Sequence, residues 1–205
     1  METLESCRKI INSILSNGLE KGPRAFLVTS SVAGEGASAV AVNLAKFLAK
    51  YQGMKVCLID ANSRNPSLHA VFDFENYIGF SDVAAGKAGL LDVLQRTEVP
   101  HLAVITSGPD NLGNLEPQKT RSLIQQLNAR FDCLIFDSSP VSDHSDPLAL
   151  ASLVDGVILV VHAGKTRWEV VQNAKEQLLI VHANILGVVL NQRKYYIPEF
   201  IYRKL

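Results

Sequence analysis

The stretch "FLVTSSVAGEGASAVAVNLAKFLAK" (residues 26–50) has the layout of a loop that holds a phosphate group. The apolar run from Phe26 to Ser30 is typical of a buried strand, and the pattern over 38–51 is typical of a helix. Between them, Gly34 and Gly36 allow backbone conformations and close approaches that side chains would obstruct. Successive N–H groups in such a loop, with the first turn of the following helix, can surround an anion. We therefore predict a phosphate-binding loop.

One residue departs from the usual pattern of such loops. In G-x-x-x-x-G-K-[ST], a lysine that reaches the β- and γ-phosphates precedes the hydroxyl residue, but Ala37 precedes Ser38 in this chain. Ser38 stands where a hydroxyl would bind Mg²⁺. A plain strand-to-helix turn is the alternative interpretation of the two glycines. The loop residues that we expect to bind a nucleotide are Gly34, Glu35, Gly36, Ala37, Ser38 and Ala39.

Composition predicts one cytoplasmic domain. The chain has 205 residues, 47% of them hydrophobic, which is enough for a sizeable core in a single domain over 1–205. Its formal net charge is zero, so no overall field favours nucleic acid, and we expect no nucleic-acid partner. The cysteines Cys7, Cys57 and Cys133 lack the spacing of a zinc site or a disulfide framework. No apolar run has the length of a membrane span, and charges occupy the first residues, where a secretory signal needs an apolar core.

The chain alternates expected strands and helices. Continuous apolar runs, which are typical of strands covered on both faces, occupy 25–30, 55–60, 102–108, 132–137, 156–162 and 185–191. Helical patterns occupy 2–17, 38–51, 117–130, 146–153 and 167–182. This order predicts an α/β fold, a doubly wound and mainly parallel sheet of about seven strands or fewer. Ligands of such sheets bind beyond the carboxyl ends of the strands.

Two aspartates stand at predicted strand ends. Asp60 ends the second strand and Asp137 ends a later one, and a carboxylate there is costly to bury without a partner. With Ser38, they would offer Mg²⁺ a few oxygen ligands, which waters and phosphate oxygens complete. We expect the three side chains to converge at one edge of the sheet as a magnesium site. For Asp60, a helix or turn cap is the alternative interpretation.

Taken together, these motifs resemble one family over nearly the whole chain. The chain is similar to the cytoplasmic bacterial tyrosine autokinases of capsule and exopolysaccharide synthesis, which share the P-loop NTPase fold of septum-positioning and plasmid-partition ATPases. The stretches that carry the resemblance are "ESCRKI" (5–10), "VTSSVAGEGAS" (28–38), "LIDANSRNPSLH" (58–69), "FDCLIFDSSP" (131–140), "VDGVILVV" (154–161) and "LGVVLNQ" (186–192).

The resemblance implies roles and partners. It implies that ATP or ADP binds with Mg²⁺, that Asn191 hydrogen-bonds the adenine, and that Asp60 is a possible catalytic residue. It also implies an N-terminal interaction helix over 1–20, with Glu5 and Arg8 in a homo-oligomer contact. A membrane-bound polysaccharide co-polymerase or adaptor would be the partner, holding the protein at the inner membrane. The tail 192–205 would carry possible phosphoacceptors, which are Tyr195, Tyr196 and Tyr202. Alternatively, the apolar residues of the tail dock it on the domain or on a partner.

Several residues depart from the family pattern. Ala37 replaces the lysine, Ala39 a threonine and Asn62 the second aspartate of D-x-D, and Ile11 and Ala33 depart elsewhere. Loss of one oriented cation slows phosphoryl transfer by about 10²–10³-fold if it resembles loss of an oxyanion donor. Three interpretations stay open. The protein is a degenerate nucleotide- or anion-binding regulator or scaffold, an active autokinase with an atypical site, or a partition-type positioning ATPase; the last is disfavoured because the extra lysine of that group has no counterpart in "SSVAGEG".

Overall fold

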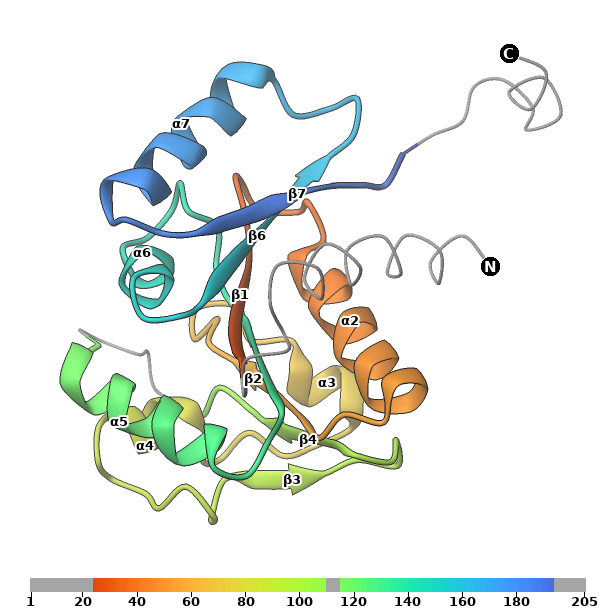
Figure 1. Cartoon of the computed structure of the whole chain (residues 1–205), viewed down its shortest axis with the longest axis vertical. Helices are drawn as coiled ribbons and strands as arrows, with labels where there is room; N and C mark the ends of the chain where they lie inside the picture. The colour runs from red at the N-terminus through yellow and green to blue at the C-terminus, as the bar shows by residue number, and fades with distance from the viewer. Residues whose placement is uncertain (1–23, 110–114, 194–205) are drawn as a thin grey trace, which may run out of the picture.

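The computed structural model describes residues 24–109 and 115–193, which form one seven-stranded sheet between helices (Figure 1). The strand order is β3-β4-β2-β5-β1-β6-β7. The predicted helix over 2–17, Glu5, Arg8 and the tyrosines Tyr195, Tyr196 and Tyr202 lie outside the described residues.

The strands are parallel except at one edge. The strands are β1 Arg24–Ser30, β2 Val56–Asp60, β3 Leu94–Arg96, β4 Leu102–Ile105, β5 Cys133–Asp137, β6 Gly156–His162 and β7 Ile185–Asn191. Among the described strands, only β3 is antiparallel to its neighbour, β4. The doubly wound, mainly parallel fold is thus confirmed. β3 was not predicted, because its three partly exposed residues show none of the continuous apolar pattern of the central strands.

Helices cover both faces of the sheet. They are α2 Ala37–Gln52, α3 Leu68–Phe72, α4 Phe80–Ala84, α5 Pro117–Asn128, α6 Asp146–Ala151 and α7 Trp168–Ile180. Side chains alternate along β1, so that Leu27 packs on the face of α5, α6 and α7 while Val28 packs on the face of α2. The central strands are therefore buried on both faces, which explains their uninterrupted apolar sequences.

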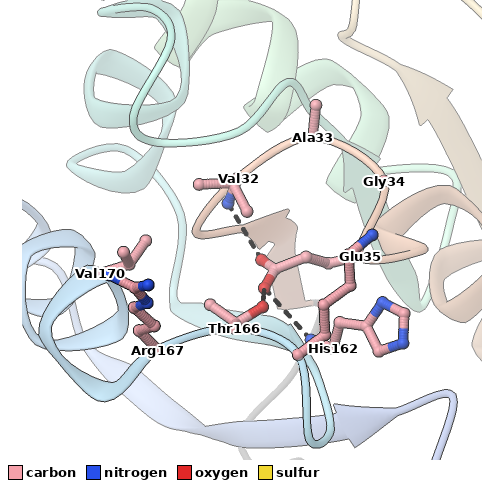
Figure 2. Close-up of a pocket in the computed structure, with 9 residues that line it drawn as sticks. Val32, Ala33, Gly34, Glu35, His162, Thr166, Arg167 and Val170 are labelled. Carbon is pink, nitrogen blue, oxygen red and sulfur yellow. Dashed lines mark hydrogen bonds between the residues drawn. The ribbon is translucent and has the colours of Figure 1, made fainter.

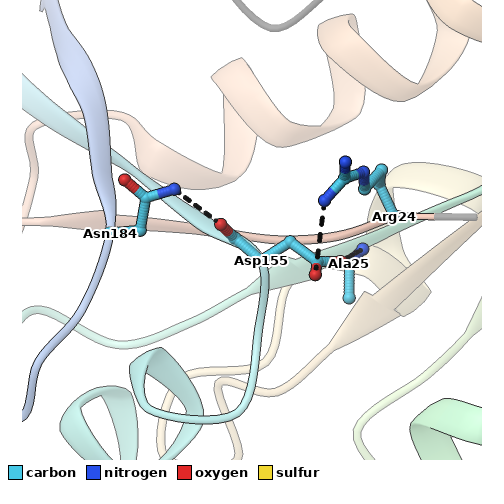
Figure 3. Close-up of polar contacts among 4 residues, drawn as sticks. All are labelled: Arg24, Ala25, Asp155 and Asn184. Carbon is cyan, nitrogen blue, oxygen red and sulfur yellow. Dashed lines mark hydrogen bonds and ion pairs between the residues drawn. The ribbon is translucent and has the colours of Figure 1, made fainter. Parts of the chain in front are cut away.

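Polar contacts fix the amino ends of three strands (Figure 3). The Asp155 carboxylate accepts a hydrogen bond from the Ala25 N–H at 2.8 Å and lies 3.6 Å from the Arg24 guanidinium. The Asp155 carbonyl accepts a hydrogen bond from the Asn184 side chain at 2.9 Å. These contacts align the starts of β1, β6 and β7, and hence their ends at the opposite edge. Within the described ranges, no helix has the length and apolarity needed to cross a membrane.

Candidate functional site

The loop between β1 and α2 lies at the carboxyl edge of the sheet and needs both of its glycines. Gly34 has a φ of 83° and Gly36 a φ of 86°, a left-handed conformation that L side chains rarely adopt. A Cβ atom on Gly36 would also lie 2.3 Å from Nδ2 of Asn191. The glycines therefore allow the chain to turn sharply into α2 against the end of β7.

The carbonyl groups of this loop have hydrogen-bond partners in the described chain, whereas its N–H groups do not. The carbonyls of Gly34 and Glu35 accept hydrogen bonds from the side-chain amides of Gln192 at 3.3 Å and Asn191 at 2.9 Å. In contrast, no residue of the described chain accepts a hydrogen bond from the backbone N–H groups of residues 34–39. These N–H groups include the first turn of α2, whose partial positive charge favours an anion. These N–H groups fit the predicted phosphate-binding loop, whose ligand stays a prediction.

The side chain of Glu35 is buried and turns back under the loop (Figure 2). One carboxylate oxygen accepts hydrogen bonds from the Ser31 N–H and hydroxyl, both at 2.7 Å, and from the Val32 N–H at 3.0 Å. The other accepts from the His162 N–H at 3.1 Å and from the Thr166 hydroxyl. Burial raises the pKa of Glu35, but these hydrogen bonds outweigh it and leave the pKa below its ordinary value. Glu35 is therefore a structural anion within the loop.

Asp60 caps the short helix α3. One carboxylate oxygen accepts a hydrogen bond from the Asn62 N–H at 3.1 Å, and the other accepts from the N–H groups of Ser67 at 2.9 Å and Leu68 at 3.0 Å. The side-chain oxygen of Asn62 accepts from the Asn65 N–H at 3.3 Å, so Asn62 shapes the same turn. Burial raises the pKa of Asp60 more than these hydrogen bonds lower it. Asp60 therefore acts as a helix cap in this structure, which was the alternative interpretation, while its role in metal binding stays a prediction.

Asp137 is a buried carboxylate at the end of β5. It faces Asp60 in register across β5 and β2, and neither of its oxygens has a hydrogen-bond partner among the described residues. Burial, and then the charge of Asp60, raise the pKa of Asp137 to about 8, against the opposing effect of the nearby Ser38 hydroxyl. The structure thus brings Ser38, Asp60 and Asp137 together at one edge of the sheet. A buried carboxylate that has only the Ser38 hydroxyl near it among the described residues fits a bound cation such as Mg²⁺.

The predicted metal site is small. The described part of the chain holds no cluster of three or more His, Cys, Asp or Glu side chains that could bind a metal alone. Mg²⁺ normally uses one or two carboxylates and takes its other ligands from water and phosphate oxygens. The donor set of Ser38 and Asp137, with Asp60 alongside, therefore fits Mg²⁺ held together with a nucleotide.

Three residues near the loop were not predicted as part of the site. His162 ends β6, Thr166 follows it, and Gln192 follows β7, all at the carboxyl edge of the sheet. The rule that ligands bind beyond strand ends could have drawn attention to them, although it does not reveal their contacts. Asn191, which the family resemblance assigns to the adenine, contacts the Glu35 carbonyl in this structure, and its adenine role stays a prediction.

Comparison with known proteins decides the family. Residues 23–202 match the family model for ParA, NUBPL iron-transfer P-loop NTPase. The chain belongs to this family of P-loop NTPases. Its relatives include tyrosine-protein kinase YwqD of Bacillus subtilis, 35% identical over 193 residues that span 93% of this chain and 81% of the relative. Tyrosine-protein kinase CpsD of Streptococcus agalactiae is 33% identical over 195 residues, spanning 93% and 84%.

Solved structures agree with this assignment. The chimerical protein CapA2B2 superposes with a TM-score of 0.82 at 27% identity, over 92% of this chain and 84% of that one. The VpsO kinase domain has a TM-score of 0.80 at 29% identity, over 94% and 97%. The septum site-determining protein MinD of Pyrococcus horikoshii, solved with Mg-ADP, has a TM-score of 0.72 over 89% and 76%, and at 21% identity it shows the shared fold alone. The resemblance to bacterial tyrosine kinases is thus confirmed for this P-loop NTPase.

Proposed function

We propose that this protein binds the phosphates of ATP or ADP with Mg²⁺, transfers phosphate very slowly or not at all, and acts as a regulator or scaffold of exopolysaccharide synthesis. The observation that carries the binding proposal is the set of N–H groups over residues 34–39 without an acceptor among the described residues. The N–H groups at the start of a helix have no acceptor within the helix, and an anion is a suitable partner for them.

The remaining side chains divide the work of binding. Ser38 and Asp137 would hold Mg²⁺, and Asp60 fixes the turn beside them through its three backbone hydrogen bonds. When bound, Mg²⁺ would neutralise part of the charge on the phosphate oxygens. These contacts serve the bound nucleotide whether or not it reacts.

Two positions of the proposed site, Ala37 and Asn62, lack the groups that favour phosphate transfer. Ala37 offers no cation to the charge that develops on the transferring phosphate, which we expect to cost about 10²–10³-fold in rate. Asn62 cannot accept a proton, and its side-chain oxygen is engaged with the Asn65 N–H. We therefore infer that binding persists while catalysis is largely lost.

An active tyrosine autokinase is the second candidate. It is favoured by two relatives that are named tyrosine-protein kinases and match 93% of the chain, and by the retained Asp137. On that proposal, the phosphoacceptors are Tyr195, Tyr196 and Tyr202 in the tail. A partition-type ATPase stays a third, weaker candidate.

Location and partners follow from the same proposal. A regulator of this kind would work in the cytoplasm and reach the inner membrane through a membrane-bound polysaccharide co-polymerase or adaptor. Glu5 and Arg8 would contribute to a homo-oligomer. No overall positive charge favours nucleic acid as a partner.

Calorimetric titration with Mg-ADP and Mg-ATP tests the proposed binding. We expect the parent protein to bind weakly, and Ala37→Lys to bind roughly 1–3 kcal/mol more tightly, the scale of a charged hydrogen bond. Asn43→Lys is the matched control, because it adds the same charge to the exposed face of α2. No heat from the parent, and no gain in Ala37→Lys over Asn43→Lys, would refute the phosphate site.

Labelling with γ-labelled ATP separates the first two candidates. The regulator proposal expects negligible incorporation into the parent protein. Rapid labelling that disappears when Tyr195, Tyr196 and Tyr202 are all changed to Phe would instead establish the autokinase.

A further inference from the structure

The carboxylate of Glu35 joins two segments that are distant in sequence. Three of its hydrogen bonds come from Ser31 and Val32 at the start of the loop, and two come from His162 and Thr166 at the junction of β6 with α7. All five donors are uncharged backbone or hydroxyl groups, and no described cation forms an ion pair with the carboxylate. One buried negative charge, held by uncharged donors, thus bridges the two segments.

The backbone of the same residue belongs to the anion-binding loop. Glu35 lies between Gly34 and Gly36, both at positive φ, and its carbonyl accepts the amide of Asn191 at 2.9 Å. A ligand that draws the N–H groups of 34–39 toward itself therefore acts directly on the backbone that carries the bridging carboxylate. Because the carboxylate has little freedom in its pocket of donors, such a displacement passes to its partners.

On the β6–α7 side, the bridge lies close in sequence to an exposed tryptophan. Thr166 precedes Arg167, the N-cap of α7, and Trp168 opens this helix with 70% of its surface exposed. A cavity of about 230 Å³ separates the loop, over residues 32–35, from the β6–α7 junction, so side-chain packing does not fill the space between them (Figure 2). Glu35 is therefore the polar link between the described parts of these two segments.

We propose that Glu35 is a positioning residue that ties the phosphate loop to the β6–α7 junction, so that ligand binding in the loop shifts the start of α7. The ligand part of this inference rests on the proposed nucleotide binding, whereas the bridge itself exists without a ligand. The position of the exposed start of α7, next to Lys165 and Arg167, would thereby depend on whether a nucleotide is bound. Nothing in this device requires phosphate transfer.

Fluorescence of Trp168, the one tryptophan of the chain, tests the coupling. In the full-length parent, titration with Mg-ADP should change the emission with the same midpoint as the calorimetric titration. Thr166→Val removes one donor with little change in shape and should lose at least half of the emission change at saturation. Thr166→Ser keeps the hydroxyl and should restore it. Thr120→Val removes a buried hydroxyl on α5, bonded to the Glu116 carbonyl, and should respond like the parent.

Hydrogen exchange tests the bridge without any ligand. In Thr166→Val and Glu35→Gln we expect the Val32 and His162 N–H groups to exchange at least tenfold faster than in the parent, and in Thr120→Val at the parent rate. Absence of calorimetric binding would refute the proposed function. The hydrogen-exchange rates would still show whether Glu35 forms the bridge, because that measurement needs no ligand. Unchanged exchange in the two bridge variants, or a full emission change in Thr166→Val, would overturn the positioning role.

Discussion

Two buried carboxylates near the carboxyl edge of the sheet, Glu35 and Asp137, have opposite environments. Glu35 accepts five hydrogen bonds, and its pKa lies below the ordinary value. Asp137 has no hydrogen-bond partner among the described residues, and burial raises its pKa to about 8. Burial raises the pKa of both, so the supply of donors to Glu35 and the charge of Asp60 beside Asp137 decide which one stays charged.

The difference separates structure from function. The chain itself completes the environment of Glu35, which is what a residue that holds the loop requires. The environment of Asp137 becomes complete only with a proton or a cation, which is what a ligand for Mg²⁺ requires. Asp60 is intermediate, because three N–H donors are not enough to offset its burial.

The largest expected effect is the pH dependence caused by Asp137. Its pKa is raised in the folded protein, so its stabilising contribution is complete below the ordinary pKa and is lost as pH rises toward 8. Without Mg²⁺, the free energy of unfolding of the parent should fall relative to that of Asp137→Asn by about 1.2 kcal/mol per pH unit between pH 5 and 8, about 3.6 kcal/mol in all. Urea unfolding in EDTA measures it. A constant difference across that range would mean that Asp137 is ionised when folded.

Glu35→Gln should cost the next largest amount. The amide group of glutamine would face either the N–H groups of Ser31 and Val32 or that of His162, leaving buried donors without acceptors. We expect the free energy of unfolding to fall by about 3 kcal/mol. Glu98→Gln, at an exposed position, is the matched control and should change it by less than about 0.5 kcal/mol. Equal effects of the two changes would contradict the structural role of Glu35.

The two glycines that flank Glu35 provide a finer test. Gly36→Ala combines a strained positive φ with a Cβ atom 2.3 Å from the Asn191 amide, whereas at Gly34 the added Cβ meets nothing within 4 Å. We expect Gly36→Ala to lower the free energy of unfolding by about 2 kcal/mol and Gly34→Ala by about 1 kcal/mol. Thermal unfolding followed by circular dichroism measures both. If Gly34→Ala is the more damaging change, the contact with Asn191 does not constrain the loop.

The sequence predicted the sheet better than it predicted the site. Continuous apolar runs mark strands that are buried on both faces, and an aspartate that ends such a run, as Asp137 does, is visible without a structure. β3 escaped prediction because its residues are partly exposed and few. The bridge through Glu35 could not be predicted, since its partners His162 and Thr166 lie 127 and 131 residues away and a sequence does not show which way a loop side chain turns.

The smallest expected effect concerns another carboxylate, Asp155, at the opposite edge of the sheet. Its ion pair with Arg24 spans 3.6 Å, and the two side chains are 41% and 25% exposed, so water and salt screen the attraction. Arg24→Ala should therefore lower the free energy of unfolding by less than about 1 kcal/mol, and added salt should diminish even that loss. Asp155→Ala should cost more, because it also removes the acceptor of the Ala25 N–H at 2.8 Å. Urea unfolding at low and high salt compares the two variants. If Arg24→Ala lowers the free energy of unfolding as much as Glu35→Gln does, then ion pairing, rather than the number of hydrogen bonds accepted, determines how much a carboxylate stabilises this fold.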